Sequence, residues 1–275
     1  MNPLFETSAE VTPDILFVDC RHSLKDKDLG QRLYEDHHIP NAIFAHIEKD
    51  LSDPEKISKK IYGRHPLPAV EDFINFLQVN GINSDTHLVA YDDDGGVYAA
   101  RFWWMLNWIG HHKVSILNGG LKAWQKSGNH LENTRPERKR GQIKKKPGLV
   151  HQWKIAEISA WIESEKNIDV GLLIDARMPE RFNGEVEPLD LKAGHIAGAL
   201  NRPYVDNLEE NGYFKSPEKL RKEFLEVLNY TNPASVVHMC GSGITACHNL
   251  VSMEIAELVG SNLYVGSWSE WIQHN

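Results

Sequence analysis

The chain has 275 residues, enough for one large or two medium domains, and its 41% hydrophobic and 25% charged residues are typical of a globular protein. A net charge of −8 argues against general nucleic-acid binding, and no apolar run is long enough to span a bilayer. Residues 1–10 lack the pattern of a secretory signal, so we expect a cytoplasmic protein without nucleic-acid or membrane partners.

Cysteine and histidine usage also limits the possible chemistry. The three cysteines, Cys20, Cys240 and Cys247, are too few and odd in number for a disulfide framework, which fits a reducing compartment. We interpret Cys20 and Cys247 as core residues. The sequence has no CxxC or HExxH motif, and its 14 histidines show no metal-ligand spacing. We therefore expect no metal and no organic cofactor.

Short apolar runs rich in Val, Ile and Leu predict strands, and apolar residues at helical spacing predict helices. The expected strands are 15–18, 88–91, 114–117, 172–174, 236–239 and 262–265. The expected helices are 69–77, a helix that starts at Ser216-Pro217, and 245–258. This alternation predicts an α/β fold with mostly parallel sheets flanked by helices on both faces.

The two halves of the sequence resemble each other. Four segments recur in the same order: 15–21 as 172–177, 38–42 as 195–199, 88–92 as 236–240, and 119–124 as 265–271. We predict two copies of one domain, at 1–128 and 151–275, joined by a linker at 129–150. The basic residues of this linker indicate either a solvated connection or an anion-binding patch.

The most informative segment follows the strand predicted at 236–239. There, Cys240-Gly241-Ser242-Gly243 forms a glycine-rich turn that leads into a helix starting at Thr245. The glycines let successive backbone N–H groups converge, and the helix N-terminus adds its positive dipole end. The turn therefore predicts an anion cradle around the cysteine sulfur, which favours a thiolate and would also hold an anionic persulfide.

Three interpretations of Cys240 compete. It can be a buried structural cysteine before a tight turn. A phosphatase loop would need an arginine six residues after the cysteine, and Ala246 occupies that position in a loop without basic residues. The remaining interpretation is covalent catalysis with the thiolate as nucleophile.

The loop Cys240-Gly241-Ser242-Gly243-Ile244-Thr245-Ala246 resembles the active loop of the 3-mercaptopyruvate branch of the tandem-domain rhodanese-type sulfurtransferases. The resemblance covers nearly the whole chain. Further matches are Gly194-His195-Ile196, Asn118-Gly119-Gly120, Gly266-Ser267-Trp268 and Ala100-Arg101-Phe102-Trp103-Trp104. The resemblance implies two rhodanese-like modules of which only the C-terminal one is reactive, because Asp92 stands where the second copy has Cys240.

The resemblance also implies roles for single residues. Cys240 takes sulfur from an anionic donor as a persulfide and passes it to a thiol, cyanide or thioredoxin-like acceptor in a ping-pong cycle. Ser242 either relays a proton or holds the loop by a hydrogen bond. The other loop residues are Gly241, Gly243, Ile244, Thr245 and Ala246, and the implied substrate-binding residues are Arg181, Arg101, His65 and Glu48.

Recognition of the donor is less defined. Arg181 matches the substrate-gripping arginine of the family, with a surface ion pair as the alternative. Mammalian-type 3-mercaptopyruvate enzymes carry a second arginine after a Glu-Pro pair, but no arginine follows Glu187-Pro188 closely here, so help would come from Lys192 or Arg101. The neutral loop favours 3-mercaptopyruvate and the missing arginine favours thiosulfate. A persulfide carrier or a regulatory sulfur-binding module is the alternative of another class.

Overall fold

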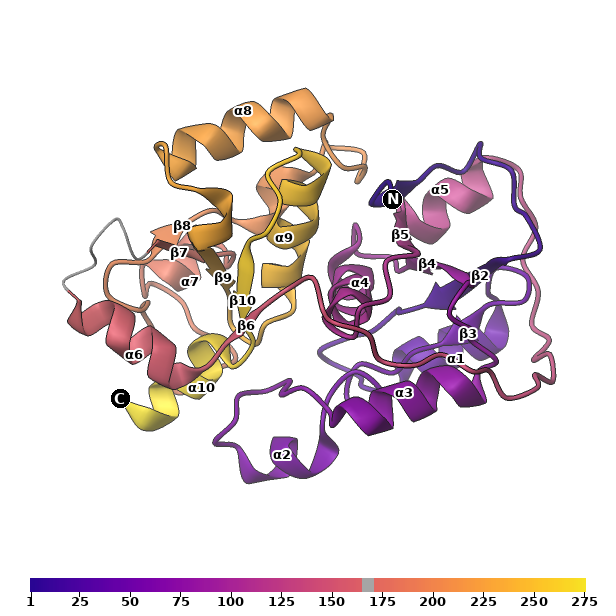
Figure 1. Ribbon diagram of the computed structural model, residues 1–275, viewed down its shortest axis with the longest axis horizontal. Helices are drawn as coiled ribbons and strands as arrows, with labels where there is room; N and C mark the ends of the chain where they lie inside the picture. The colour runs from indigo at the N-terminus through magenta and orange to yellow at the C-terminus, as the bar shows by residue number, and fades with distance from the viewer. Residues whose placement is uncertain (165–170) are drawn as a thin grey trace. The chain divides into compact units, whose positions relative to one another are not determined.

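The computed structural model describes residues 1–164 and 171–275 and contains two compact units (Figure 1). Unit 1 comprises residues 1–53, 67–149 and 210–213. Unit 2 comprises residues 54–66, 150–209 and 214–275. The segment 54–66 therefore belongs to unit 2, although it lies in the first half of the sequence.

Unit 1 is a parallel sheet with strand order β1-β5-β4-β2-β3 and helices on both faces. The side chains of Phe17 and Val89 on one face pack with Tyr34 and Trp124 from two helices, and α4 covers the other face. The strands are β1 (Leu4–Phe5), β2 (Ile15–Asp19), β3 (Ile43–Phe44), β4 (His87–Tyr91) and β5 (Val114–Leu117), and the helices are α1 (Leu29–Asp36), α3 (Val70–Val79), α4 (Val97–Trp108) and α5 (Gly120–Lys126).

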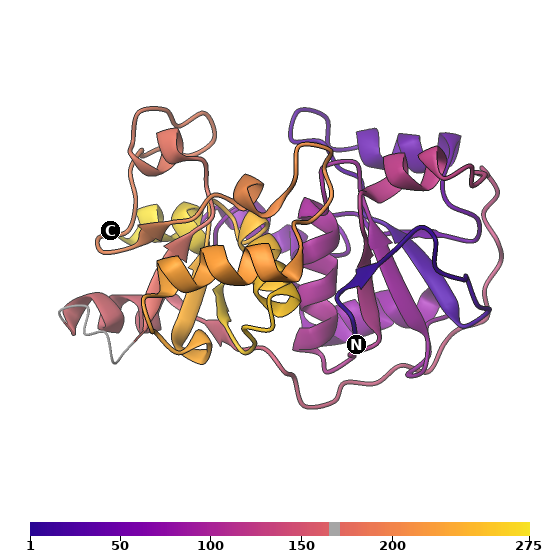
Figure 2. The same ribbon diagram turned by 90° about the horizontal axis from the view of Figure 1, so that it is seen from above.

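The stretch predicted as a linker is fully described and contains no helix or named strand at 129–149 (Figure 2). It runs along unit 1 through backbone hydrogen bonds. Ile143 donates to the carbonyl of Ile82 at 3.2 Å, and Lys146 donates to the carbonyl of Ile109 at 2.9 Å. These bonds attach the stretch to unit 1 for most of its length.

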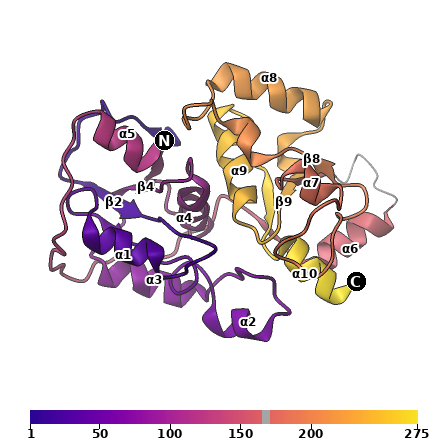
Figure 3. The same ribbon diagram turned by 180° about the vertical axis from the view of Figure 1, so that it is seen from behind.

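Unit 2 repeats this architecture with strand order β6-β10-β9-β7-β8, again parallel. Helices α8 and α9 lie on one side of the strands, and α6 and α10 lie on the other (Figure 3). The strands are β6 (Gln152–Trp153), β7 (Leu172–Asp175), β8 (Leu200–Asn201), β9 (Val236–Met239) and β10 (Asn262–Tyr264). The helices are α2 (Pro54–Lys59), α6 (Ile155–Glu163), α7 (Pro179–Phe182), α8 (Pro217–Leu228), α9 (Thr245–Ile255) and α10 (Ser267–His274), with single 3₁₀ turns η2 (Tyr204–Asn207) and η3 (Pro233–Ser235).

The internal repeat predicted from the sequence is confirmed by strand order and register. The central strands β4 and β9 occupy the same place in the two sheets. The end of β4 pairs Tyr91 with Asp19, and the end of β9 pairs Met239 with Asp175. The next residues along the chain, Asp92 and Cys240, therefore occupy equivalent positions. The predicted fold, two α/β modules with parallel sheets, is also confirmed.

A buried ion pair recurs at the end of the neighbouring strand in each unit. Arg21 binds Asp19 with an Nη2–Oδ2 distance of 2.7 Å, and both side chains are at most 2% exposed. Arg177 binds Asp175 at the same distance, and its Nη2 also donates to the carbonyl of Gly194 at 2.7 Å. Because the pair recurs in the copy without the cysteine, we assign Arg177 a structural role.

We predict that Arg21→Met lowers the free energy of unfolding by about 3–5 kcal/mol, because it leaves the buried carboxylate of Asp19 without its main partner. Urea denaturation measures this loss. Arg32→Met is the matched control, since Arg32 pairs with Asp26 on the surface and its loss should change little. Equal effects of both substitutions would contradict the structural role of the buried pair.

Candidate functional site

Cys240 stands directly after β9, at the carboxyl edge of the parallel sheet, where α/β folds bind their ligands. It is 2% exposed, and Ser242 in the following turn is 6% exposed. Helix α9 begins at Thr245, and the first N–H groups of a helix have no intrahelical acceptor. The sulfur therefore lies beside a helix N-terminus in a buried turn.

The sulfur atom accepts a hydrogen bond from the backbone of the turn. The N–H of Gly243 donates to Cys240 Sγ at 3.1 Å. Gly243 has a φ of +75°, and a Cβ at this position would lie 2.5 Å from the carbonyl oxygen of Val265. Only glycine combines a positive φ with the absence of a Cβ, so the backbone that directs this N–H at the sulfur requires glycine at position 243.

The start of α10 fixes the other side of the turn. The N–H of Cys240 donates to Ser267 Oγ at 3.1 Å. The N–H groups of Trp268 and Ser269 donate to the carbonyls of Cys240 and Gly241, each at 3.0 Å. These bonds hold the backbone of the loop without using the cysteine sulfur.

The equivalent turn in unit 1 holds a carboxylate. Burial raises the pKa of Asp92 to about 6, against the lowering effect of its backbone hydrogen bonds. The donors to its two carboxylate oxygens, at 2.8–3.0 Å, are the N–H groups of Asp94, Gly96, Tyr98 and Ala99. This strand-to-helix turn thus directs several N–H groups at an acceptor, as the glycine pattern predicts for the Cys240 loop.

Two arginines reach the Cys240 loop within unit 2. A Cβ added at Gly241 would lie 2.6 Å from Nη2 of Arg64, and 3.3 and 3.5 Å from Nη2 and Nη1 of Arg181. Arg181 lies on α7, and Arg64 lies on the segment 54–66. Both guanidinium groups therefore stand beside the residue that follows the cysteine.

Two buried carboxylates hold these arginines. Glu187 accepts from Arg181 Nη2 at 2.7 Å and from Nε at 3.2 Å. Asp190 pairs with Arg64 Nη1 through one oxygen and with Arg181 Nη2 at 3.3 Å through the other. Burial acts to raise the pKa of Glu187, but the hydrogen bonds from Arg181 and the backbone outweigh it and hold the pKa below its usual range.

The sequence-predicted site residues fall into both units. Cys240, Ser242, Arg181 and His65 belong to unit 2, where His65 is 5% exposed. Unit 1 contains the other two: Arg101 is fully buried on α4 and donates to the carbonyl of Leu51 at 3.3 Å, and Glu48 pairs with Lys27 at 2.8 Å.

The sequence interpretation missed one cation. It named Lys192 and Arg101 as helpers of Arg181, but Lys192 Nζ donates to the main-chain oxygen of Asn275 at 2.5 Å. The residue at the Cys240 loop is Arg64. Arg64 directly precedes His65, which was itself a candidate, and this was the one indication in the sequence. That the segment 54–66 belongs to unit 2 could not be predicted from the sequence.

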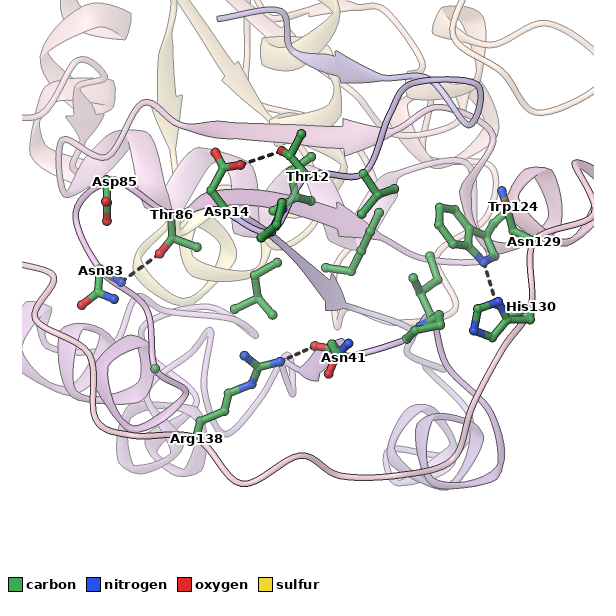
Figure 4. Close-up of a pocket in the computed structure, with 18 residues that line it drawn as sticks. Thr12, Asp14, Asn41, Asn83, Asp85, Thr86, Trp124, Asn129, His130 and Arg138 are labelled. Carbon is green, nitrogen blue, oxygen red and sulfur yellow. Dashed lines mark hydrogen bonds between the residues drawn. The ribbon is translucent and has the colours of Figure 1, made fainter.

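A cavity of about 720 Å³ in unit 1 lies elsewhere (Figure 4). Its walls include the start of β2 and residues just before β4, so it opens at the edge where the parallel strands begin. Asp92 stands at the opposite edge. Arg138, one of the lining residues, donates to the carbonyl of Asn41. The cavity contains none of the predicted site residues.

No cluster of three or more His, Cys, Asp or Glu side chains is placed to hold a metal ion among residues 1–164 and 171–275. Within the same ranges, no helix has the length and apolar character needed to cross a membrane.

Comparison with known proteins gives the family. A model described as the rhodanese-like domain matches residues 7–127 and again 155–274. A probable 3-mercaptopyruvate sulfurtransferase of Pseudomonas aeruginosa is 42% identical over 262 residues, which cover 94% of this chain and 90% of that protein. The thiosulfate sulfurtransferase of Rattus norvegicus is 31% identical over 276 residues, covering 97% and 88%.

A solved structure agrees with these relatives. The 3-mercaptopyruvate sulfurtransferase from Leishmania major matches with a TM-score of 0.82 and 33% identity, covering 94% of this chain and 70% of that one. The chain belongs to the rhodanese-like family and contains two copies of the domain. More narrowly, it is a tandem-domain sulfurtransferase of the group that includes these relatives.

We predict that Gly243→Ala lowers sulfur transfer by about 100-fold, because the strained and displaced backbone no longer directs its N–H at the sulfur. The φ strain should also cost about 1–3 kcal/mol of unfolding free energy. Gly128→Ala is the control, since Gly128 has a φ of +80° with nothing within 4 Å of an added Cβ. It should lose stability but keep activity. Full activity of folded Gly243→Ala would contradict the role of this N–H.

Proposed function

We propose that the protein transfers sulfur from 3-mercaptopyruvate to a thiol or cyanide acceptor through a persulfide on Cys240. The observation that carries this proposal is the position of that sulfur, which lies at the carboxyl end of the central strand and accepts the N–H of Gly243 at 3.1 Å. Asp92 supports it, because the same turn in unit 1 accommodates an anion with four backbone N–H groups.

The first half-reaction needs no metal, oxidant or reductant. The Cys240 thiolate attacks the sulfur of the donor, an S–S bond forms, and the donor's C–S bond breaks with its electron pair left on carbon. The resulting enolate of pyruvate takes up a proton, for which we propose the hydroxyl of Ser242 as the relay. In the second half-reaction the acceptor attacks the outer sulfur, and the Cys240 thiolate leaves.

The anionic end of the donor needs a cation beside the loop. We propose Arg181 for this role, supported by its Nη1 near Gly241 and by a side chain that is 18% exposed and so open to a small ligand. His65 remains a proposed neighbour of the donor. Arg101 and Glu48 remain sequence predictions.

Thiosulfate is the second candidate donor. It is favoured by the 31% identical thiosulfate sulfurtransferase, which aligns with nearly the whole chain. For the physiological acceptor we propose a thiol, with a thioredoxin-like dithiol as one form, in the cytoplasm. The three cysteines, all free, support this reducing location.

The test is to treat the protein with each donor without acceptor and to weigh the tryptic peptides. We expect one added sulfur on the Cys240 peptide, discharged by cyanide, and no transfer by Cys240→Ser. Cys20→Ala is the control because Cys20 is a buried cysteine of unit 1 and should not affect turnover. Turnover by Cys240→Ser, or no added sulfur in the wild type, would refute the proposal. Slow loading with little turnover would indicate a persulfide carrier.

A further inference from the structure

The guanidinium groups of Arg64 and Arg181 form a fork over the Cys240 loop. Each is held by a buried carboxylate and lies beside Gly241. Arg64 Nη1 is paired with Asp190, while Nε and Nη2 of Arg181 are bonded to Glu187. The remaining groups, Arg64 Nη2 and Arg181 Nη1, lie 2.6 and 3.5 Å from the point where a Cβ on Gly241 would stand, and neither donates to an acceptor among the described residues.

In this cluster the carboxylates are buried and the arginines are partly exposed, as a ligand-binding site requires. The carboxylates of Glu187 and Asp190 are each 4% exposed, so they are fixed inside the protein. The side chains of Arg64 and Arg181 are 27% and 18% exposed, so a small solute can reach them. Two fixed guanidinium groups with free N–H donors offer a preorganised site for one carboxylate.

We propose that Arg64 is the second donor-binding cation of the enzyme, and that Asp190 positions it and sets the charge of the site so that a monoanionic 2-oxo acid is preferred over a dianion. This inference rests on the proposed function. In this chain Arg64, on the segment 54–66, supplies the second guanidinium group in place of the arginine that is absent after Glu187-Pro188.

The net charge of the side chains around the site explains why a monoanionic donor would be preferred over a dianionic one. The linked cluster contains three arginines and three carboxylates and is formally neutral; its members are Arg64, Arg177, Arg181, Asp175, Glu187 and Asp190. A carboxylate donor leaves one uncompensated charge in this partly buried site, and thiosulfate leaves two. Because charges removed from water interact strongly, the second uncompensated charge is the more costly one.

The first test is steady-state kinetics of Arg64→Gln with 3-mercaptopyruvate and cyanide. We expect KM to rise by about 10- to 100-fold, the equivalent of one charged hydrogen bond, with kcat changed by less than about threefold. Arg64→Lys should recover part of the loss, because lysine keeps the positive charge but lacks the planar set of guanidinium donors. Arg221→Gln is the matched control, since Arg221 is an exposed arginine of unit 2 that donates to the carbonyl of Ala256.

The second test addresses Asp190. Asp190→Asn adds one formal positive charge to the cluster, so the ratio of kcat/KM for thiosulfate to that for 3-mercaptopyruvate should rise by about tenfold or more. A ratio that stays constant would overturn the charge argument. A general loss of activity with both donors at an unchanged ratio would overturn it as well.

A readout independent of turnover separates this inference from the proposed function. Pyruvate carries the same carboxylate without the sulfur, and its binding to Cys240→Ser can be measured by calorimetry. We expect binding that is weakened at least tenfold when Arg64→Gln is added. If the wild type loads sulfur on Cys240 but Arg64→Gln changes neither KM nor pyruvate binding, the role of Arg64 is wrong and the function stands. If the wild type loads no sulfur, the function itself fails.

Discussion

The site depends on one constraint, a turn in which backbone N–H groups are directed at the residue that ends the central strand. Both units contain this turn, with different occupants. In unit 1 the carboxylate of Asp92 fills it and accepts four N–H groups. In unit 2 the smaller side chain of Cys240 accepts one, from Gly243. The carboxylate of Asp92 fills the turn with its own negative charge and provides no sulfur nucleophile. A cysteine sulfur can instead accept a further sulfur atom and keep a negative charge.

The rest of each unit keeps this turn in place. The strand beside the central one ends in a buried Asp-Arg pair, Asp19 with Arg21 in one unit and Asp175 with Arg177 in the other. Each arginine also donates to a distant carbonyl, that of His37 or Gly194. In unit 2 Arg177 also pairs with Glu187, and Glu187 binds Arg181, so the ion pair that both copies share is linked there to an arginine beside the Cys240 loop.

Sequence patterns predicted the features that depend on residues close together in the chain. The strands, the helix capped by Ser216 and the equivalence of Asp92 with Cys240 follow from short apolar runs and the repeat, and the structure has them. Helix α9 ends at Ile255, earlier than expected, and nearly all of its residues are buried, so it has no polar face to mark its extent. The place of Arg64 could not be predicted, because the packing of 54–66 in unit 2 depends on contacts between residues far apart in sequence.

The arginine fork also changes how the neutral Gly-Ser-Gly loop is understood. From the sequence, a loop without cations favours a donor with little charge. In the structure the cations come from outside the loop, on Arg64 and Arg181, and their charge is balanced by Glu187 and Asp190. The charge that a donor meets is therefore set by carboxylates behind the arginines rather than by the loop beside the sulfur. Donor preference can then differ between chains with the same loop, because a single buried carboxylate is enough to change the balance.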